Sequence, residues 1–231
     1  STLAAETLEA AAAPHDVDIQ LRLGDVYRRT ADDQIASGAD WGDVGYFLEL
    51  ASTAYKNAAA SAPAGDTRAV ARLIDLELTA YGDHDAALAR ANAALETTPD
   101  CAEMRLSRGL AHMAAYWSAY ELQDWTTCDA RWLEAEADLR AAAEGLPSHR
   151  TEPYAELIWL YAQKANRGAD AVAAATEVLD RDPSTSIDDL YYLATAYARA
   201  GDSRAAASAL LALADRRPEE LTARVAAEDD L

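Results

Sequence analysis

The stretch "YARAGDSRAAASALLALADRRP", residues 197–218, is an apolar helical pattern interrupted by Gly201-Asp202 and closed by Pro218. Glycine readily takes the left-handed conformation that ends a helix, and a new helix can begin directly after it. The stretch therefore predicts a helix, a tight turn and a second helix. Whether this pattern recurs at a fixed period decides the architecture of the whole chain.

Six of the seven prolines mark such a period. Successive intervals are 49, 36, 48, 36 and 35 residues, between Pro14, Pro63, Pro99, Pro147, Pro183 and Pro218. An alanine stands twelve residues before each of the last five prolines, at Ala51, Ala87, Ala135, Ala171 and Ala206. Five residues before the same prolines are small or compact apolar residues, Ala58, Ala94, Ala142, Val178 and Leu213. This regularity predicts close helix contacts that demand small side chains.

The first half of each period also repeats. "LGDVY" (23–27) and "LATAY" (193–197) share a leucine, a small residue and a tyrosine, whereas "LIWLY" (157–161) has Ile158 at the small position. The pattern resembles the tetratricopeptide repeat, a helix-turn-helix of 34 residues with a Leu-Gly-x-x-Tyr core and a closing proline. This resemblance implies an all-α fold, a right-handed α-solenoid of helix pairs, because each pair completes its core only by stacking on the next.

We expect one array over residues 1–231. Its divisions are a half unit (1–14), five units (15–63, 64–99, 100–147, 148–183 and 184–218) and a terminal helix (219–231). The second unit departs from the family, because Asp75 occupies the small position of its first helix. The first and third units depart from it by insertions.

Composition limits the classes of partner. The net charge of −20 opposes binding to nucleic acid and direct contact with anionic membranes. No apolar run approaches the roughly 18 residues of a membrane-spanning helix, and Glu6 and Glu9 stand where a secretory signal would carry basic residues. We expect a cytoplasmic protein in which Cys101 and Cys128 are unpaired thiols. Because the sequence begins inside a helical pattern, it could also be a segment of a larger polypeptide.

Motifs of catalysis, phosphate binding and zinc binding are absent from the sequence. Its four histidines are far apart, and His112 is expected to be a packed or helix-surface residue. Paired carboxylates such as Asp32-Asp33 are interpreted as solvated surface. We therefore predict no enzyme activity, cofactor or metal site.

The family resemblance indicates which side chains face the concave groove. In tetratricopeptide repeats these are positions 2, 5, 9, 12 and 13 of the first helix. They correspond to Asp18, Leu21, Asp25, Arg28 and Arg29; to Glu152, Ala155, Trp159, Ala162 and Gln163; and to Asp188, Tyr191, Thr195, Ala198 and Arg199. The subclass that grips a peptide carboxylate uses lysine and asparagine there, so this chain does not resemble it. The predicted groove contacts are Arg28, Arg29, Trp159, Tyr191, Thr195 and Arg199.

The insertion in the third unit, "AYWSAYELQDWTTCDARW" (115–132), concentrates aromatic residues. About 14 extra residues would lengthen both helices by two turns and place Trp125 near their tip. Its candidate partner-binding residues are Tyr116, Trp117, Tyr120 and Trp125. Alternatively, these rings pack the pair against itself or against the first insertion (30–47), which Gly38, Gly42 and Gly45 predict to be more loop-like. Trp132 is expected to be structural.

These observations favour a protein-interaction scaffold that binds a peptide or partner protein through its groove or its aromatic edge. One alternative is a self-assembling structural or regulatory segment, because the half unit before Pro14 needs a neighbour. Another alternative is a small-molecule or enzymatic role, here or in a missing domain.

Overall fold

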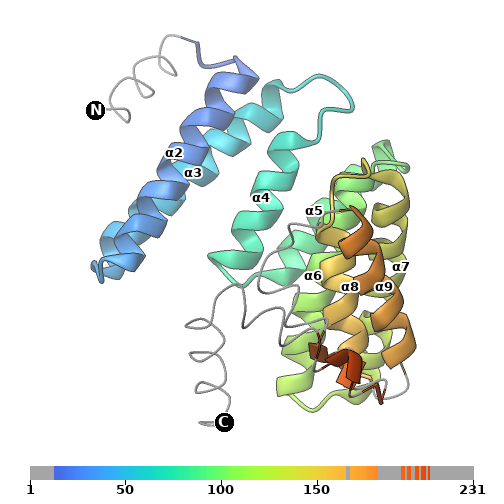
Figure 1. The fold of residues 1–231 in the computed structure, drawn as a ribbon. Helices are drawn as coiled ribbons and strands as arrows, with labels where there is room; N and C mark the ends of the chain where they lie inside the picture. Colours follow the sequence, from blue (N-terminus) through green and yellow to red (C-terminus); the bar gives the residue numbers. More distant parts are fainter. Residues whose placement is uncertain are drawn as a thin grey trace. The chain divides into compact units, whose positions relative to one another are not determined.

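The computed structural model describes residues 13–164 and 167–181, together with separate positions between 194 and 208. The described part of the chain consists of α-helices joined by turns and contains no β-strand (Figure 1). The chain divides into two compact units, residues 1–131 and 132–231. The boundary between these units falls inside one helix, α7 (Trp125–Gly145).

The unit at residues 1–131 is built from antiparallel helix pairs. Its helices before α7 are α2 (Val17–Ala36), α3 (Trp41–Ser61), α4 (Arg68–Thr79), α5 (His84–Thr97) and α6 (Ala102–Glu121). Figure 1 shows α2 and α3 side by side along their length, and each later helix up to α6 contacts its predecessor. The first helices of successive pairs, α4 and α6, also touch. This is the contact expected when helix pairs stack in a row.

The unit at residues 132–231 contains most of α7, followed by α8 (Glu152–Ala162) and α9 (Gly168–Arg181), which pack against each other. The four described pairs fall within the ranges 15–63, 64–99, 100–147 and 148–183. That the whole chain forms one array stays a prediction. The half unit 1–14 (except its last two residues), most of 184–218 and the terminal helix 219–231 lie outside the described residues.

Aspartates begin the second helix of several pairs. The side chains of Asp40 and Asp83 accept hydrogen bonds from the backbone amides of Gly42 and Ala86, at 2.7 and 3.0 Å. Such N-caps satisfy amides that have no partner inside the helix. The preceding turns contain Gly38 and Gly82 with positive φ, of 74° and 63°. The glycine-aspartate punctuation therefore ends one helix and starts the next.

The five periodic alanines lie at close helix contacts, as predicted. Four of them, Ala51, Ala87, Ala135 and Ala171, have no accessible surface, and Ala206 is buried. Three of the four described residues five positions before the prolines are buried as well. A larger side chain at these positions would force the helices apart, which explains why alanine recurs there.

The prediction that the first insertion is loop-like is wrong. Helices α2 and α3 contain 20 and 21 residues, against 12 and 14 in α4 and α5, so the insertion lengthens the pair. Gly42 and Gly45 lie within α3, where burial of Val44 and Leu48 outweighs the helix penalty of about 1 kcal/mol per glycine. Of the three glycines in this insertion, only Gly38 has the positive φ that glycine tolerates.

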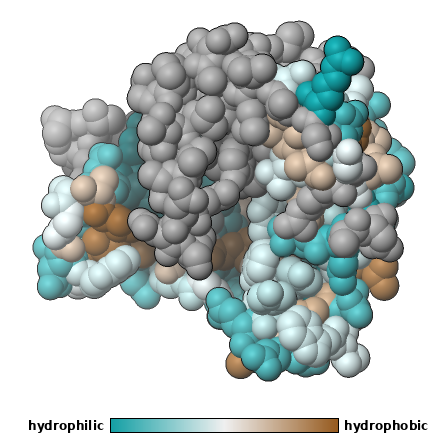
Figure 2. Space-filling view, turned by 60° about the horizontal axis from the view of Figure 1, so that its bottom comes forward, coloured by the Kyte–Doolittle hydropathy of each residue, from teal (hydrophilic) through white to brown (hydrophobic). Residues whose placement is uncertain are grey.

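Cys101 and Cys128 are free thiols, as predicted, and His112 is packed. None of the described helices is both long and apolar enough to cross a membrane. Figure 2 shows one face of the molecule, where hydrophilic residues are widespread and apolar residues gather in separate patches.

Candidate functional site

Arg28 and Arg29, two predicted groove residues on α2, have different surroundings. Arg28 is half-buried; its Nε lies 3.1 Å from Asp32 Oδ1, and one terminal nitrogen donates to Thr79 Oγ1 on α4 at 2.7 Å. Arg29 is exposed and, within the described residues, forms no hydrogen bond or ion pair. Arg28 thus joins two neighbouring helices, and Arg29 is open to a partner.

The acidic groove positions of α2 are also used inside the chain. Asp25 Oδ1 accepts from the Tyr55 hydroxyl at 2.8 Å and lies 3.1 Å from Arg72 Nε. Asp18 Oδ1 lies 2.7 Å from a terminal nitrogen of Arg68. These contacts link α2 to α3 through Tyr55 and to α4 through Arg68 and Arg72. Most of the charge on this part of the groove is therefore matched internally.

The remaining groove candidates are less fully described. Trp159 and Thr195 are half-buried, and each takes part in interactions within the chain. Tyr191 and Arg199 lie outside the described residues.

The aromatic residues of the second insertion meet at the turn between α6 and α7. Edge-to-face contacts join Tyr116 to Trp117, Trp117 to Tyr120, and Tyr120 to Trp125, with ring centroids 5.2, 5.6 and 5.5 Å apart. This geometry is favourable for aromatic pairs. The rings thus pack the extended pair against itself, the alternative left open by the sequence, and Trp125 lies at the tip as expected.

Three apolar side chains of this turn nevertheless face solvent. Tyr120, Leu122 and Trp125 are 46%, 78% and 58% exposed, whereas Tyr116 is buried. We call Tyr116, Trp117, Tyr120, Leu122 and Trp125 the aromatic tip. Its inner rings support its outer ones, so the tip offers a prearranged apolar surface.

The start of α7 fixes this turn. Asp124 accepts from the hydroxyl and backbone amide of Thr127, at 2.6 and 3.1 Å. These hydrogen bonds, above all the one from the hydroxyl, hold the pKa of Asp124 below its usual value, so the carboxylate is ionised at neutral pH. Gln123, which precedes it, has a φ of 59°. At neutral pH a negative charge therefore lies directly beside Trp125 in the aromatic tip.

A second cluster, in the unit at 132–231, centres on the carboxylate of Glu136. Arg167 donates to it from both terminal nitrogens, at 2.5 and 3.2 Å, and the Tyr161 hydroxyl donates at 3.0 Å. A terminal nitrogen of Arg140 lies 3.2 Å from Glu136 Oε1, and Arg140 Nε donates to the Tyr161 hydroxyl oxygen at 2.9 Å. Burial, above all, raises the pKa of Tyr161 to about 12, so its hydroxyl stays protonated and can donate.

Two aromatic rings also contact the guanidinium of Arg167. Its guanidinium lies 4.9 Å from the ring centre of Trp132 and 4.6 Å from that of Tyr161. Trp132 is 4% exposed, and its indole N–H donates to the carbonyl oxygen of Leu160 at 3.1 Å. Trp132 is thus structural, as predicted. Cation–π contacts and a carboxylate together hold one arginine between α7 and α8.

A Glu136→Gln substitution should lower the free energy of unfolding at pH 7 by about 1–3 kcal/mol, because charge-assisted hydrogen bonds are lost. Burial acts to raise the pKa of Glu136, but the hydrogen bonds of Arg167 and Tyr161 and the nearby arginine charges lower it overall. A carboxyl group whose pKa is lower in the folded than in the unfolded chain stabilises the fold at pH values above its unfolded pKa. This stabilisation is lost as the pH falls through the pKa of the folded chain. The difference between variant and wild type should therefore shrink below about pH 4.5.

Urea unfolding at several pH values, followed by circular dichroism, measures this difference. Glu121→Gln, the same exchange at an exposed glutamate, is the control and should have little effect. A Glu136→Gln deficit that is unchanged at pH 3 would contradict the assignment.

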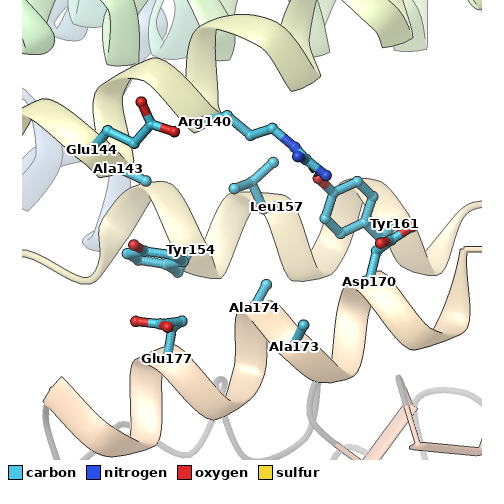
Figure 3. A pocket seen from close by; sticks show the side chains of 10 residues that line it. All are labelled: Arg140, Ala143, Glu144, Tyr154, Leu157, Tyr161, Asp170, Ala173, Ala174 and Glu177. Carbon is cyan, nitrogen blue, oxygen red and sulfur yellow. Dashed lines mark hydrogen bonds between the residues drawn. The ribbon is translucent and has the colours of Figure 1, made fainter.

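A pocket of about 240 Å³ lies beside this cluster, between α7, α8 and α9 (Figure 3). It is lined by Leu157, by alanines of α7 and α9, and by Tyr154 and Tyr161. Arg140 and Tyr161 meet at one end in Figure 3, and Tyr154 lies between Glu144 and Glu177 at the other. The pocket is apolar in its middle and acidic at one end.

Known proteins that resemble this chain were found through its structure. No protein-family model matches the sequence, and no curated protein matches it either. The thermophilic protein TTC0263 of Thermus thermophilus is 19% identical, with a TM-score of 0.64 over 90% of this chain and 100% of that one. PilW, a type IV pilus biogenesis factor, is 17% identical, with a TM-score of 0.69 over 96% and 88%. YrrB is 16% identical, with a TM-score of 0.57 over 97% and 98%.

TTC0263 and YrrB are described as tetratricopeptide-repeat proteins, and their likeness covers nearly the whole of this chain. The chain has the tetratricopeptide-repeat fold. YrrB is described as having an unusual peptide-binding site, which is a property of that protein. At these identities the likeness establishes the tetratricopeptide-repeat fold and leaves the partner of this chain to be inferred from its own residues.

Sequence reasoning within the tetratricopeptide-repeat pattern missed two features. The Glu136 cluster and the pocket at α7–α9 arise from residues far apart in sequence, which no local motif marks. A third feature had a visible signal: Asp-Trp occurs in both insertions, at 40–41 and 124–125. In each case aspartate precedes an exposed tryptophan at the first position of a helix, Trp41 or Trp125.

Among the described residues, no group of His, Cys, Asp and Glu could hold a metal ion.

Proposed function

We propose that the chain is a protein-interaction scaffold that binds a partner polypeptide through its aromatic tip. The observation that carries this proposal is the exposure of Trp125, Leu122 and Tyr120 beside a cluster of rings in edge-to-face contact. Aromatic residues held in one conformation concentrate binding energy, because they bury a large area and lose little conformational entropy. The tetratricopeptide-repeat fold supports the proposal, since it presents surfaces and contributes no chemistry of its own.

The aromatic tip is favoured over the groove as the binding site because most charged groove residues of α2 already have partners within the chain. Asp18, Asp25 and Arg28 on α2 are engaged with residues of α4, so a ligand in this part of the groove would compete with existing pairs. A partner that binds the exposed rings of the aromatic tip would not have to displace such pairs. Arg29 remains a candidate contact in the groove.

We infer a non-catalytic role and a protein partner. The sequence holds no catalytic motif, and its net charge of −20 opposes nucleic acid. Apolar rings beside the ionised Asp124 suit a partner segment that combines apolar and basic residues.

The Trp125→Ala variant should reduce capture of the partner at least about tenfold, because a central aromatic anchor contributes about 2 kcal/mol or more. The experiment places photo-reactive benzoylphenylalanine at position 125 of the full chain, and cross-links it in lysate of the source organism. The adduct is identified by mass spectrometry, and the purified partner is then titrated against the wild type and Trp125→Ala.

Leu133 provides the control, since it is an exposed apolar residue of α7 outside the aromatic tip. Leu133→Ala should bind the partner as the wild type does, and cross-linking from position 133 should not yield the same adduct. The same adducts from both positions, or undiminished binding by Trp125→Ala, would refute the proposal. An adduct with a second copy of the chain would indicate self-assembly instead.

A further inference from the structure

The first helices of three successive pairs, α2, α4 and α6, start level with one another. Asp18, near the start of α2, lies 2.7 Å from a terminal nitrogen of Arg68, the first residue of α4. The residues that directly precede α4 and α6 also meet, because the Thr67 hydroxyl lies 3.5 Å from the Cys101 sulfur. Differences in helix length must therefore appear at the other end, where each first helix turns into its second.

The middle pair is the short one. Its first helix ends at Thr79, whose hydroxyl accepts a hydrogen bond from Arg28, the twelfth residue of α2. Helix α2 then continues to Ala36, and both α2 and α6 have 20 residues against 12 in α4. At a rise of 1.5 Å per residue, the two flanking pairs project about 12 Å beyond the α4–α5 turn. That turn is thus set back between two projecting ones.

Exposed apolar side chains gather at these three turns. Among the described residues eight large apolar side chains are exposed, and seven of them lie here; the exception is Leu133. Besides the exposed residues of the aromatic tip, they are Tyr81 after α4 and three residues around the α2–α3 turn, Ile35, Trp41 and Tyr46. We call Ile35, Trp41 and Tyr46 the α2–α3 tip. Apolar surface that is concentrated in this way marks a site of interaction.

The charge at the three turns is of one sign. Residues 30–48, 80–86 and 114–130 include no lysine or arginine. The opposite ends of the same helices differ, since Arg68 and Arg105 lie in the first turns of α4 and α6. The three turn segments carry exposed carboxylates at Asp32, Asp33, Asp40, Asp43, Asp83, Asp85, Glu121, Asp124 and Asp129. Such a surface attracts a basic polypeptide and repels a second copy of this acidic chain.

We propose that the α2–α3 tip, Tyr81 and the aromatic tip form one edge, which binds a single basic and apolar segment of the partner. The segment lies across the set-back α4–α5 turn, with Trp41 and Trp125 as its two anchors. Because neighbouring helices pack about 10 Å apart, the two tips are roughly 20 Å apart, and about six extended residues span that distance. The inference rests on the proposed scaffold function and adds a second anchor and a length to it.

The test uses displayed random peptides of about 16 residues, long enough to reach both tips. The library is first depleted on the Trp125→Ala variant and then selected on the full wild-type chain, so that the recovered peptides need the aromatic tip. Titration calorimetry of the synthesised peptides measures their affinity and stoichiometry. We expect one peptide per chain, enriched in basic and aromatic residues. Trp41→Ala should weaken it at least about fivefold, and Leu133→Ala should not.

A pair of matched double variants tests the charge. Asp33→Asn with Glu121→Gln removes two exposed carboxylates from the proposed edge, and should weaken the peptides at least about threefold at low salt. Asp100→Asn with Glu96→Gln makes the same exchanges at exposed residues near the opposite ends of the helices, and should leave the affinity unchanged. Equal effects of the two double variants would overturn the assignment of a basic segment to this edge.

The remaining outcomes separate this inference from the proposed function. Peptides that bind Trp41→Ala as tightly as the wild type would overturn the single edge and leave the aromatic tip as a binding site. Two peptides per chain would also overturn it, because the tips would then act separately. Recovery of no peptide after depletion would count against the aromatic tip itself. Self-association without peptide that Trp41→Ala abolishes would place a second copy on the edge instead.

Discussion

Trp132→Ala should lower the free energy of unfolding by about 3–5 kcal/mol. Trp132 is 4% exposed, and its ring is covered by Arg167 on one side and contacts Tyr161. Removing the indole leaves a cavity, and it also leaves the buried carbonyl oxygen of Leu160 without the hydrogen bond that Trp132 donates. Arg167 would in addition lose one of its two aromatic faces. Urea unfolding followed by circular dichroism measures the loss.

Trp41→Ala is the matched control, because Trp41 is 74% exposed at the start of α3. The identical change in chemistry should alter stability by no more than about 0.5 kcal/mol there. Similar losses at the two positions would mean that Trp132 does not carry the packing attributed to it. Because Trp41 is an exposed residue of the first insertion and Trp132 is the buried last residue of the second, the comparison also separates exposed from core tryptophan.

The positions of the helix pairs were predictable because they depend on local chemistry. Proline and the glycine-aspartate turns stop and start helices within a few residues, and alanine at Ala51, Ala87 and Ala135 is demanded by a contact that every pair repeats. The fold class follows from that repetition. Most of the chain's architecture is thus determined by a signal that recurs, and a recurring signal can be recognised in one sequence.

The error in the first insertion has a tertiary cause. Three glycines in eight residues indicated a loop, yet Gly42 and Gly45 lie in a helix that is stabilised by the burial of Val44 and Leu48. Helix propensity differs by about 1 kcal/mol between glycine and alanine, and packing of one apolar face exceeds that. The second insertion, which contains neither glycine nor proline, did form the longer helices expected of it.

The candidate sites were predictable only in part. The aromatic tip was visible, because its rings are close in sequence and lie beside a turn. Which of them face solvent was not visible: Tyr116 is buried whereas Tyr120, four residues later, is half exposed. The pocket at α7–α9 could not be foreseen, since alanine is abundant and no pattern distinguishes the alanines that line a hollow from those that close a contact. Its acidic end depends equally on which faces of three helices meet.

Gly24→Ala should lower the free energy of unfolding by about 2–3 kcal/mol, although alanine is the better helix former. A Cβ atom at this position would lie 2.3 Å from Tyr55 Cε1 and 2.5 Å from its Cδ1. The Tyr55 ring has little freedom to move, because it is 2% exposed and its hydroxyl donates to Asp25. Gly24 is the small residue of the Leu-Gly-x-x-Tyr pattern, so this close approach explains why that position requires a small residue in this pair.

Gly45→Ala separates the clash from the effect of helix propensity. Gly45 lies inside α3, and a Cβ atom there would meet nothing within 4 Å. The same substitution should therefore stabilise the chain by about 0.5–1 kcal/mol, the usual gain when alanine replaces glycine in a helix. Thermal and urea unfolding of both variants should give changes of opposite sign. A stabilising Gly24→Ala would require Tyr55 to yield at no cost, which would remove the explanation of the pattern, because the glycine would then have no steric reason to be there.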